Sequence, residues 1–93
     1  MSRSELASAS DHLERAADRA SSDRADRLRE QAAAFDGLAT ADRGPDHGRL
    51  ARHEHVLREI EAEADTNADE AVAEEVAAAL SAISSFRETL DGV

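Results

Sequence analysis

The hydrophobic residues of this chain recur every three or four positions, and no stretch of it alternates with a period of two. That spacing is typical of amphipathic α-helices, in which it places the apolar side chains along one face. Four segments carry the pattern, which predicts helices over about residues 4–20, 23–42, 47–64 and 67–91. The most regular of them is the last, with apolar residues at Val72, Val76, Ala79, Ile83, Phe86 and Leu90.

The first two predicted helices are separated by a change in the phase of the apolar pattern. The step from Ala20 to Ala25 is five residues, which a continuous helix would not keep on one face. We therefore predict a short turn at Ser21-Ser22-Asp23 between two antiparallel helices. The alternative is one kinked helix over residues 4–42.

Two further breaks separate the later helices. Residues 43–48 contain the only proline and two of the four glycines, which indicates a loop, and Asp46 is placed to cap the helix after it. Residues 66–69, Thr-Asn-Ala-Asp, resemble a capping box for the last helix, with Asp69 in the position where Glu is more usual.

These elements predict an all-α fold, an antiparallel up-down bundle of about four helices within a single domain over residues 1–93. Alanine supplies 21 of the residues, so the helices can approach closely but each buries little apolar surface. A second copy of the chain would add buried area. We therefore expect a homodimer whose interface includes part of the apolar stripe between Val72 and Leu90.

The chain is strongly acidic: it has 21 Asp and Glu residues, 11 arginines and no lysine, and its net charge is −10. Molar salt shortens the Debye length to about 3 Å and screens the repulsion between such charges. This composition therefore predicts a halophilic, salt-adapted protein. The same charge repels polyanions, so we expect no direct binding to nucleic acid.

Membrane and secreted proteins are not expected from this sequence. It has no apolar run of about 18 residues, so we expect no membrane span. Its first residues, Met-Ser-Arg-Ser-Glu-Leu, lead into a charged segment rather than the apolar core of a signal peptide, so we expect a cytoplasmic protein. Cysteine is absent, which excludes disulfides and thiol chemistry.

Positive charge gathers in one place, around the predicted loop and the start of the third helix. The candidate ligand-binding residues there are Asp46, His47, Arg49, Arg52 and His53. Arginines beside a helix N-terminus can hold an anion, although Asp46, as the cap, would fill that position itself. His53 occupies a predicted seam position between two leucines, Leu50 and Leu57. It is therefore either a partly buried structural histidine or a residue that responds to pH or contacts a ligand.

The remaining patterns give little support to catalysis or metal binding. His53 and His55 lie two residues apart, so they point to different sides of a helix, and the chain has no His-Glu-x-x-His motif. We expect His55 and Glu59 to form a surface pair, and acidic pairs such as Glu59/Glu63 to be solvated. We therefore expect no catalytic residues, no metal site, no cofactor and no enzyme activity.

An up-down bundle brings the loop before the third helix to the same end as the C-terminal part of the fourth. Arg87 lies one residue beyond Phe86, on the flank of the apolar stripe. We predict that Arg87 reaches Asp46 or the carbonyl groups that close the second helix. This contact would tie the fourth helix to the loop without any catalytic role.

Three segments, 44–53 (Gly-Pro-Asp-His-Gly-Arg-Leu-Ala-Arg-His), 57–60 (Leu-Arg-Glu-Ile) and 86–93 (Phe-Arg-Glu-Thr-Leu-Asp-Gly-Val), resemble a family of short, uncharacterised α-helical proteins of haloarchaea. The resemblance implies a haloarchaeal cytoplasmic protein. It implies no activity, and no catalytic residues are carried over from it.

The sequence therefore favours a non-enzymatic, salt-adapted helical interaction protein that self-associates as a homodimer. The alternative is a small-ligand or metal-binding module that uses residues 46–53. A third hypothesis is a transcription-associated protein that acts through an unknown protein partner rather than through contact with DNA.

Overall fold

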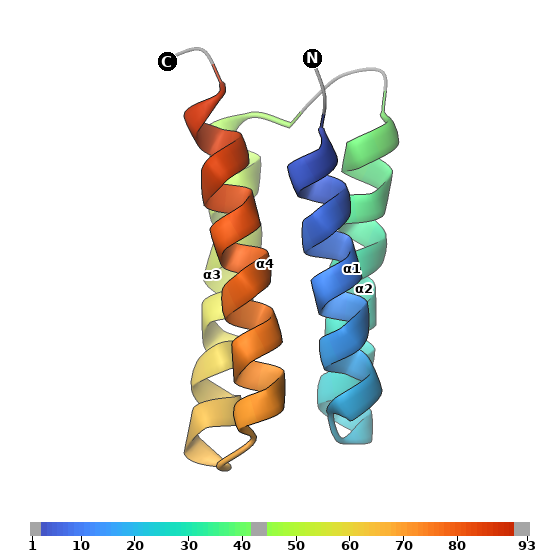
Figure 1. Cartoon of the computed structure of the whole chain (residues 1–93), viewed down its shortest axis with the longest axis vertical. Coiled ribbons are helices and arrows are strands. Elements are labelled where there is room, and N and C mark those ends of the chain that lie inside the picture. Colours follow the sequence, from blue (N-terminus) through green and yellow to red (C-terminus); the bar gives the residue numbers. More distant parts are fainter. Residues whose placement is uncertain (1–2, 42–44, 91–93) are drawn as a thin grey trace.

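Four α-helices and short connections make up the computed structural model, which describes residues 3–41 and 45–90 (Figure 1). The helices are α1 (Ser4–Arg19), α2 (Ser22–Thr40), α3 (His47–Thr66) and α4 (Glu70–Glu88). The predicted all-α fold of about four helices is confirmed. The expected ends at residues 42 and 91, and the loop residues 43 and 44, lie outside the described residues.

The chain reverses direction between α1 and α2, so the alternative of one kinked helix is wrong. Ala20 and Ser21 both have extended backbone, with ψ of 161° at each, and this stops the helical hydrogen bonding. The two helices then run antiparallel and pack against each other. One of their ties is a buried hydrogen bond, in which the Ser10 hydroxyl donates to the carbonyl oxygen of Ala32 at 2.8 Å.

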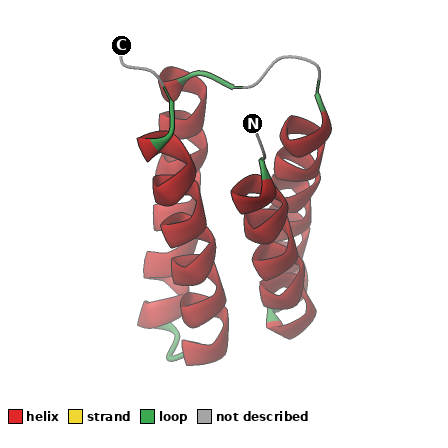
Figure 2. Ribbon diagram, turned by 45° about the horizontal axis from the view of Figure 1, so that its top comes forward, coloured by secondary structure: helices red, strands yellow, loops and turns green. Residues whose placement is uncertain are grey.

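The two helical hairpins lie side by side and form an up-down bundle of 38 × 21 × 16 Å (Figures 1 and 2). α1 packs closely on both α2 and α4, and α3 packs closely on α4. The fourth side of the bundle, between α2 and α3, is bridged largely by long polar side chains such as Arg27 and Gln31 of α2. Among the described helices, α3 therefore has α4 as its only close neighbour.

The turn between α3 and α4 differs from the predicted capping box. Thr66 is the last residue of α3, and Asp69, the N-cap of α4, makes no side-chain capping bond. The backbone N–H of Asp69 donates to the carbonyl of Ala64 at 2.8 Å, and that of Ala68 donates to Asp65 at 3.1 Å. This pair of bonds is a Schellman motif, which ends α3 by satisfying its last carbonyl groups.

The apolar stripe of α4 lies in the core of a single chain. Val72, Val76, Ala79 and Ile83 are fully buried, and Phe86 is nearly so. α1 and α3 of the same chain pack on α4 and cover these buried residues, so they are not free to form the predicted dimer interface. Whether the chain dimerises through another surface stays a prediction.

Candidate functional site

Asp46 caps the start of α3, as predicted. Its carboxylate Oδ1 accepts a hydrogen bond from the backbone N–H of Arg49 at 2.8 Å, and its own backbone is extended. A helix N-terminus attracts anions because its first N–H groups lack partners within the helix. Here the carboxylate of the chain itself occupies the place that a bound anion would take.

Arg87 ties α4 to the start of α3, but through a different acceptor from the predicted one. Its Nε donates to His47 Nδ1 at 3.1 Å, while Asp46 is used as the cap. Its Nη1 donates to Glu54 Oε1 at 2.6 Å. In this geometry His47 Nδ1 acts as a hydrogen-bond acceptor, because a guanidinium group can only donate.

Glu54 is a buried residue that the sequence reasoning missed. Only 4% of its surface is exposed, and Arg87 supplies the counter-charge that a buried carboxylate requires. The available signal was the spacing of Leu50, Glu54 and Leu57, four and then three residues apart, which is also a core spacing. The apolar pattern placed His53 on this seam, and the structure leaves His53 half-buried against α2 while Glu54 is the more deeply buried of the two.

His53 instead faces α2 and is only half-buried. Its Nδ1 donates to the amide oxygen of Gln31 at 2.8 Å, and its ring lies tilted against Phe35, with the centroids 5.0 Å apart. Burial lowers the pKa of His53 below its usual 6.5, and the nearby positive charges of Arg49 and Arg52 lower it further. The interpretation of His53 as a structural histidine therefore has direct geometric support.

The five candidate residues do not point to one place. Asp46 bonds within α3, His47 contacts α4, and His53 contacts α2. Arg49 and Arg52 are exposed, and neither forms an ion pair with any residue that the structure describes.

The other two histidines also have partners within the chain. His12 Nδ1 and Glu75 Oε1 are 2.8 Å apart and join α1 to α4. His55 Nε2 lies 3.7 Å from Glu59 Oε2 on the exposed side of α3, which confirms the predicted surface pair. In residues 3–41 and 45–90, no three His, Asp or Glu side chains are close enough together to hold a metal ion.

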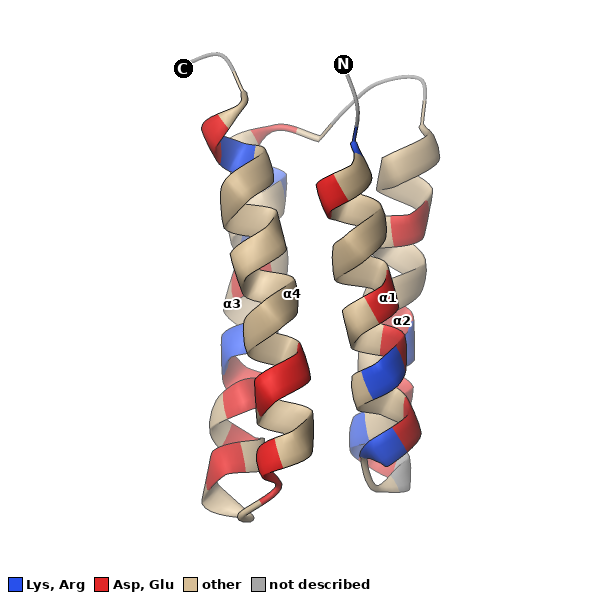
Figure 3. Ribbon diagram, viewed as in Figure 1, with Lys and Arg blue, Asp and Glu red and all other residues tan. Residues whose placement is uncertain are grey.

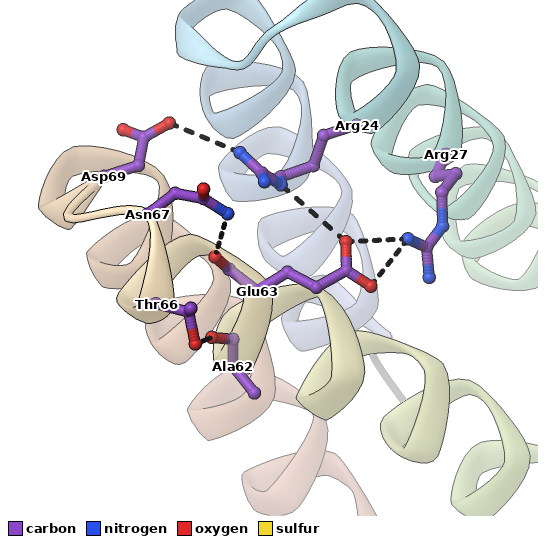
Figure 4. A network of polar contacts seen from close by, with 7 residues as sticks. All are labelled: Arg24, Arg27, Ala62, Glu63, Thr66, Asn67 and Asp69. Atoms are coloured by element: carbon purple, nitrogen blue, oxygen red, sulfur yellow. Dashed lines mark hydrogen bonds and ion pairs between the residues drawn. The ribbon is translucent and has the colours of Figure 1, made fainter.

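A polar network joins the beginning of α2 to the end of α3 and the turn that follows it (Figure 4). Arg27 Nη1 donates to both carboxylate oxygens of Glu63 at 3.0 Å. Arg24 lies between two acceptors, with its Nε 4.0 Å from Glu63 and its Nη1 3.7 Å from Asp69. Glu63 was expected to be solvated. It is half exposed, but it also joins two helices, which its position along one helix could not reveal.

None of the described helices is both long and apolar enough to cross a membrane.

Comparison with known proteins identifies a family but no activity. The family model described as "Family of unknown function (DUF7553)" matches residues 1–89, which is nearly the whole chain. This finding agrees with the predicted resemblance to an uncharacterised family. No curated protein and no solved structure matches the chain.

Proposed function

We propose that this chain, which belongs to the DUF7553 family of unknown function, is a non-enzymatic helical interaction protein that self-associates in high salt. The side chains best suited to chemistry support this proposal. Each of the four histidines has a side-chain partner within the chain, and three of them, His12, His47 and His53, join two helices. Their contacts favour a structural role over a small-ligand or metal-binding module at residues 46–53.

The packing of α3 is the observation that supports self-association. α3 packs closely on α4 alone, and its flank toward α2 is spanned by separate polar contacts rather than by close helix packing. On that flank Val56 is an apolar side chain that the chain itself covers only in part. A helix from a second copy would complete its burial, and apolar area removed from water favours association.

The acidic surface supports a working environment of high salt, and we place the protein in the cytoplasm of a salt-accumulating cell. Two copies of a chain with net charge −10 repel each other in dilute buffer. At about 2 M KCl the Debye length is close to 3 Å or below, so only charges in direct contact still interact. Association should therefore be measured in molar salt.

Light scattering coupled to size exclusion tests the proposal on the full chain. We expect the mass to rise from monomer to dimer between about 10 and 200 µM in about 2 M KCl, by mass action. A monomer over this whole range would contradict it.

A further inference from the structure

We infer that two copies of this chain pair through α3, antiparallel to each other, about a two-fold axis near Val56. This inference rests on the proposed self-association and names the surface that carries it. The surface is the α3 charge stripe, which consists of Arg49, Arg52, Val56, Glu59 and Glu63.

The α3 charge stripe lies along a single flank of the helix. Its members are spaced three, four, three and four residues apart, and that spacing keeps them on one side of an α-helix. At 1.5 Å per residue the stripe is about 21 Å long. It begins with two positive residues, has an apolar residue at its centre and ends with two negative ones. In Figure 3 the acidic residues of α3 mostly gather near its C-terminal end.

The four charged members of the stripe are exposed, although Glu63 is already paired with arginines of α2. Arg49 and Arg52 are exposed and form no ion pair within residues 3–41 and 45–90. Glu59 has a weak pair with His55 at 3.7 Å and keeps 55% of its side chain exposed. Glu63 keeps 47% exposed although Arg24 and Arg27 approach it from α2 (Figure 4).

Antiparallel pairing matches every charge in the stripe with an opposite one. Arg49 and Glu63 are each seven residues from Val56, so Arg49 of one copy lies opposite Glu63 of the other. Arg52 and Glu59 are four and three residues from Val56, so they face each other within about one residue's rise, 1.5 Å. A two-fold axis repeats both pairs, which makes the surface self-complementary, as a symmetric dimer requires.

Pairing through the stripe also brings together surfaces without net charge, whereas the rest of the acidic surface would repel a second copy. Its two arginines and two glutamates sum to zero, whereas the whole chain carries −10. No other described helix has this arrangement: arginines of α1 and α2 are interspersed with acidic residues, and α4 has acidic residues at both ends. Charge complementarity of this kind sets the orientation and the register of an interface.

A single pair of helices buries a small area, so the dimer should be weak. Interfaces below about 1,200 Å² belong to the transient class, so we expect a dissociation constant in the micromolar range or above. Molar salt weakens the attraction within these charge pairs, but groups in direct contact are screened less than charges that are farther apart than the Debye length.

Charge reversal tests the inference by sedimentation velocity on the full chain in about 2 M KCl. Arg52→Glu and Glu59→Arg should each raise the dissociation constant about tenfold or more, because each places like charges opposite each other twice in the dimer. An equimolar mixture of the two variants should form a heterodimer with the affinity of the wild type, since both pairs are then restored. Arg58→Glu is the matched control, because Arg58 is exposed on the opposite flank of α3 and its reversal should change nothing.

The outcomes separate the two proposals. If the wild type dimerises and neither reversal weakens it, the α3 interface is overturned while self-association stands. If the wild type stays monomeric, both are overturned. Circular dichroism of each variant shows that a loss of dimer is not a loss of fold.

A cross-link tests the geometry independently. The chain has no cysteine, so Val56→Cys introduces a single thiol, and the two-fold axis would bring two copies of it together. We expect mild oxidation to produce a covalent dimer from Val56→Cys and none from the control Arg58→Cys. Equal yields from the two variants would contradict an axis at Val56.

Discussion

Ala68 is the residue in the α3–α4 turn whose backbone is least suited to its side chain. Its φ is 58°, the only positive φ of a non-glycine residue in the described part of the chain. It occupies the position of the Schellman motif in which glycine is usual, because a Cβ atom crowds the carbonyl oxygen in this conformation. The turn therefore stores backbone strain at Ala68 that glycine, which has no Cβ atom, would relieve.

Ala68→Gly should stabilise the protein by about 1 kcal/mol, since the relief of strain outweighs the greater freedom of glycine in the unfolded chain. Chemical denaturation of the two proteins under the same salt conditions would measure the difference. Ala33→Gly, at an exposed position within α2, is the control and should cost about 1 kcal/mol. A loss of stability in Ala68→Gly would contradict the claim that the backbone at Ala68 is strained.

A second prediction at the scale of single residues concerns the buried ion pair between Glu54 and Arg87. Arg87→Met should lower the free energy of unfolding by about 2 kcal/mol or more, because it leaves the Glu54 carboxylate buried without its counter-charge. The double variant Glu54→Leu, Arg87→Met should be more stable than Arg87→Met alone, since it removes the unpaired charge as well. Arg58→Met, at an exposed residue without an ion pair among the described residues, should change little. Equal stability of Arg87→Met and the wild type would show that the pair is not needed.

At the scale of the helices, the half-buried position of His53 between α3 and α2 should make the stability of the fold depend on pH. Burial among α2 side chains, including Gln31 and Phe35, and then the charges of Arg49 and Arg52, lower the pKa of His53 below 6.5 in the folded protein. The unfolded chain therefore binds the proton more readily than the folded one. The contribution of neutral His53 to stability should therefore be complete above about pH 6.5 and decrease as the pH falls below that value.

We expect the free energy of unfolding to decrease between about pH 7.5 and 5.5, and His53→Gln to reduce this decrease. His55→Gln is the matched control, because His55 is exposed on the same helix and should leave the pH dependence unchanged. Equilibrium unfolding at several pH values checks both variants. A profile for His53→Gln that parallels that of the wild type would contradict the role given to His53.

At the scale of the whole molecule, the excess of negative charge should control stability. We expect the thermal midpoint to rise steeply between about 0.1 and 2 M KCl, because screening removes the repulsion among acidic groups on the folded surface. A flat or falling midpoint over this range would reject salt adaptation.

A neutralised variant provides the control for this salt dependence. Five exposed acidic residues can be changed to their amides, which alters the net charge from −10 to −5 with little effect on packing. The rise of the midpoint with salt should then be shallower. The residues are Asp11, Glu14, Asp26, Glu30 and Glu74.

The sequence by itself determined the number, order and approximate ends of the helices, together with the cap at Asp46. These features depend on residues three to five positions apart, and such residues interact within one helix or turn whatever the rest of the chain does. The break at Ala20 and the apolar stripe of α4 were readable for the same reason.

Only the tertiary structure decided how each helix is rotated and which polar groups it brings together. His53 and Glu54 are neighbours in sequence and lie about 100° apart around α3, so the rotation of the helix about its axis decides which of them is buried. Arg87 of α4 stabilises Glu54 in the buried position, while Gln31 of α2 accepts the hydrogen bond of His53. Burial of a charged residue depends on a counter-charge from another helix, and no local pattern in the sequence contains that partner.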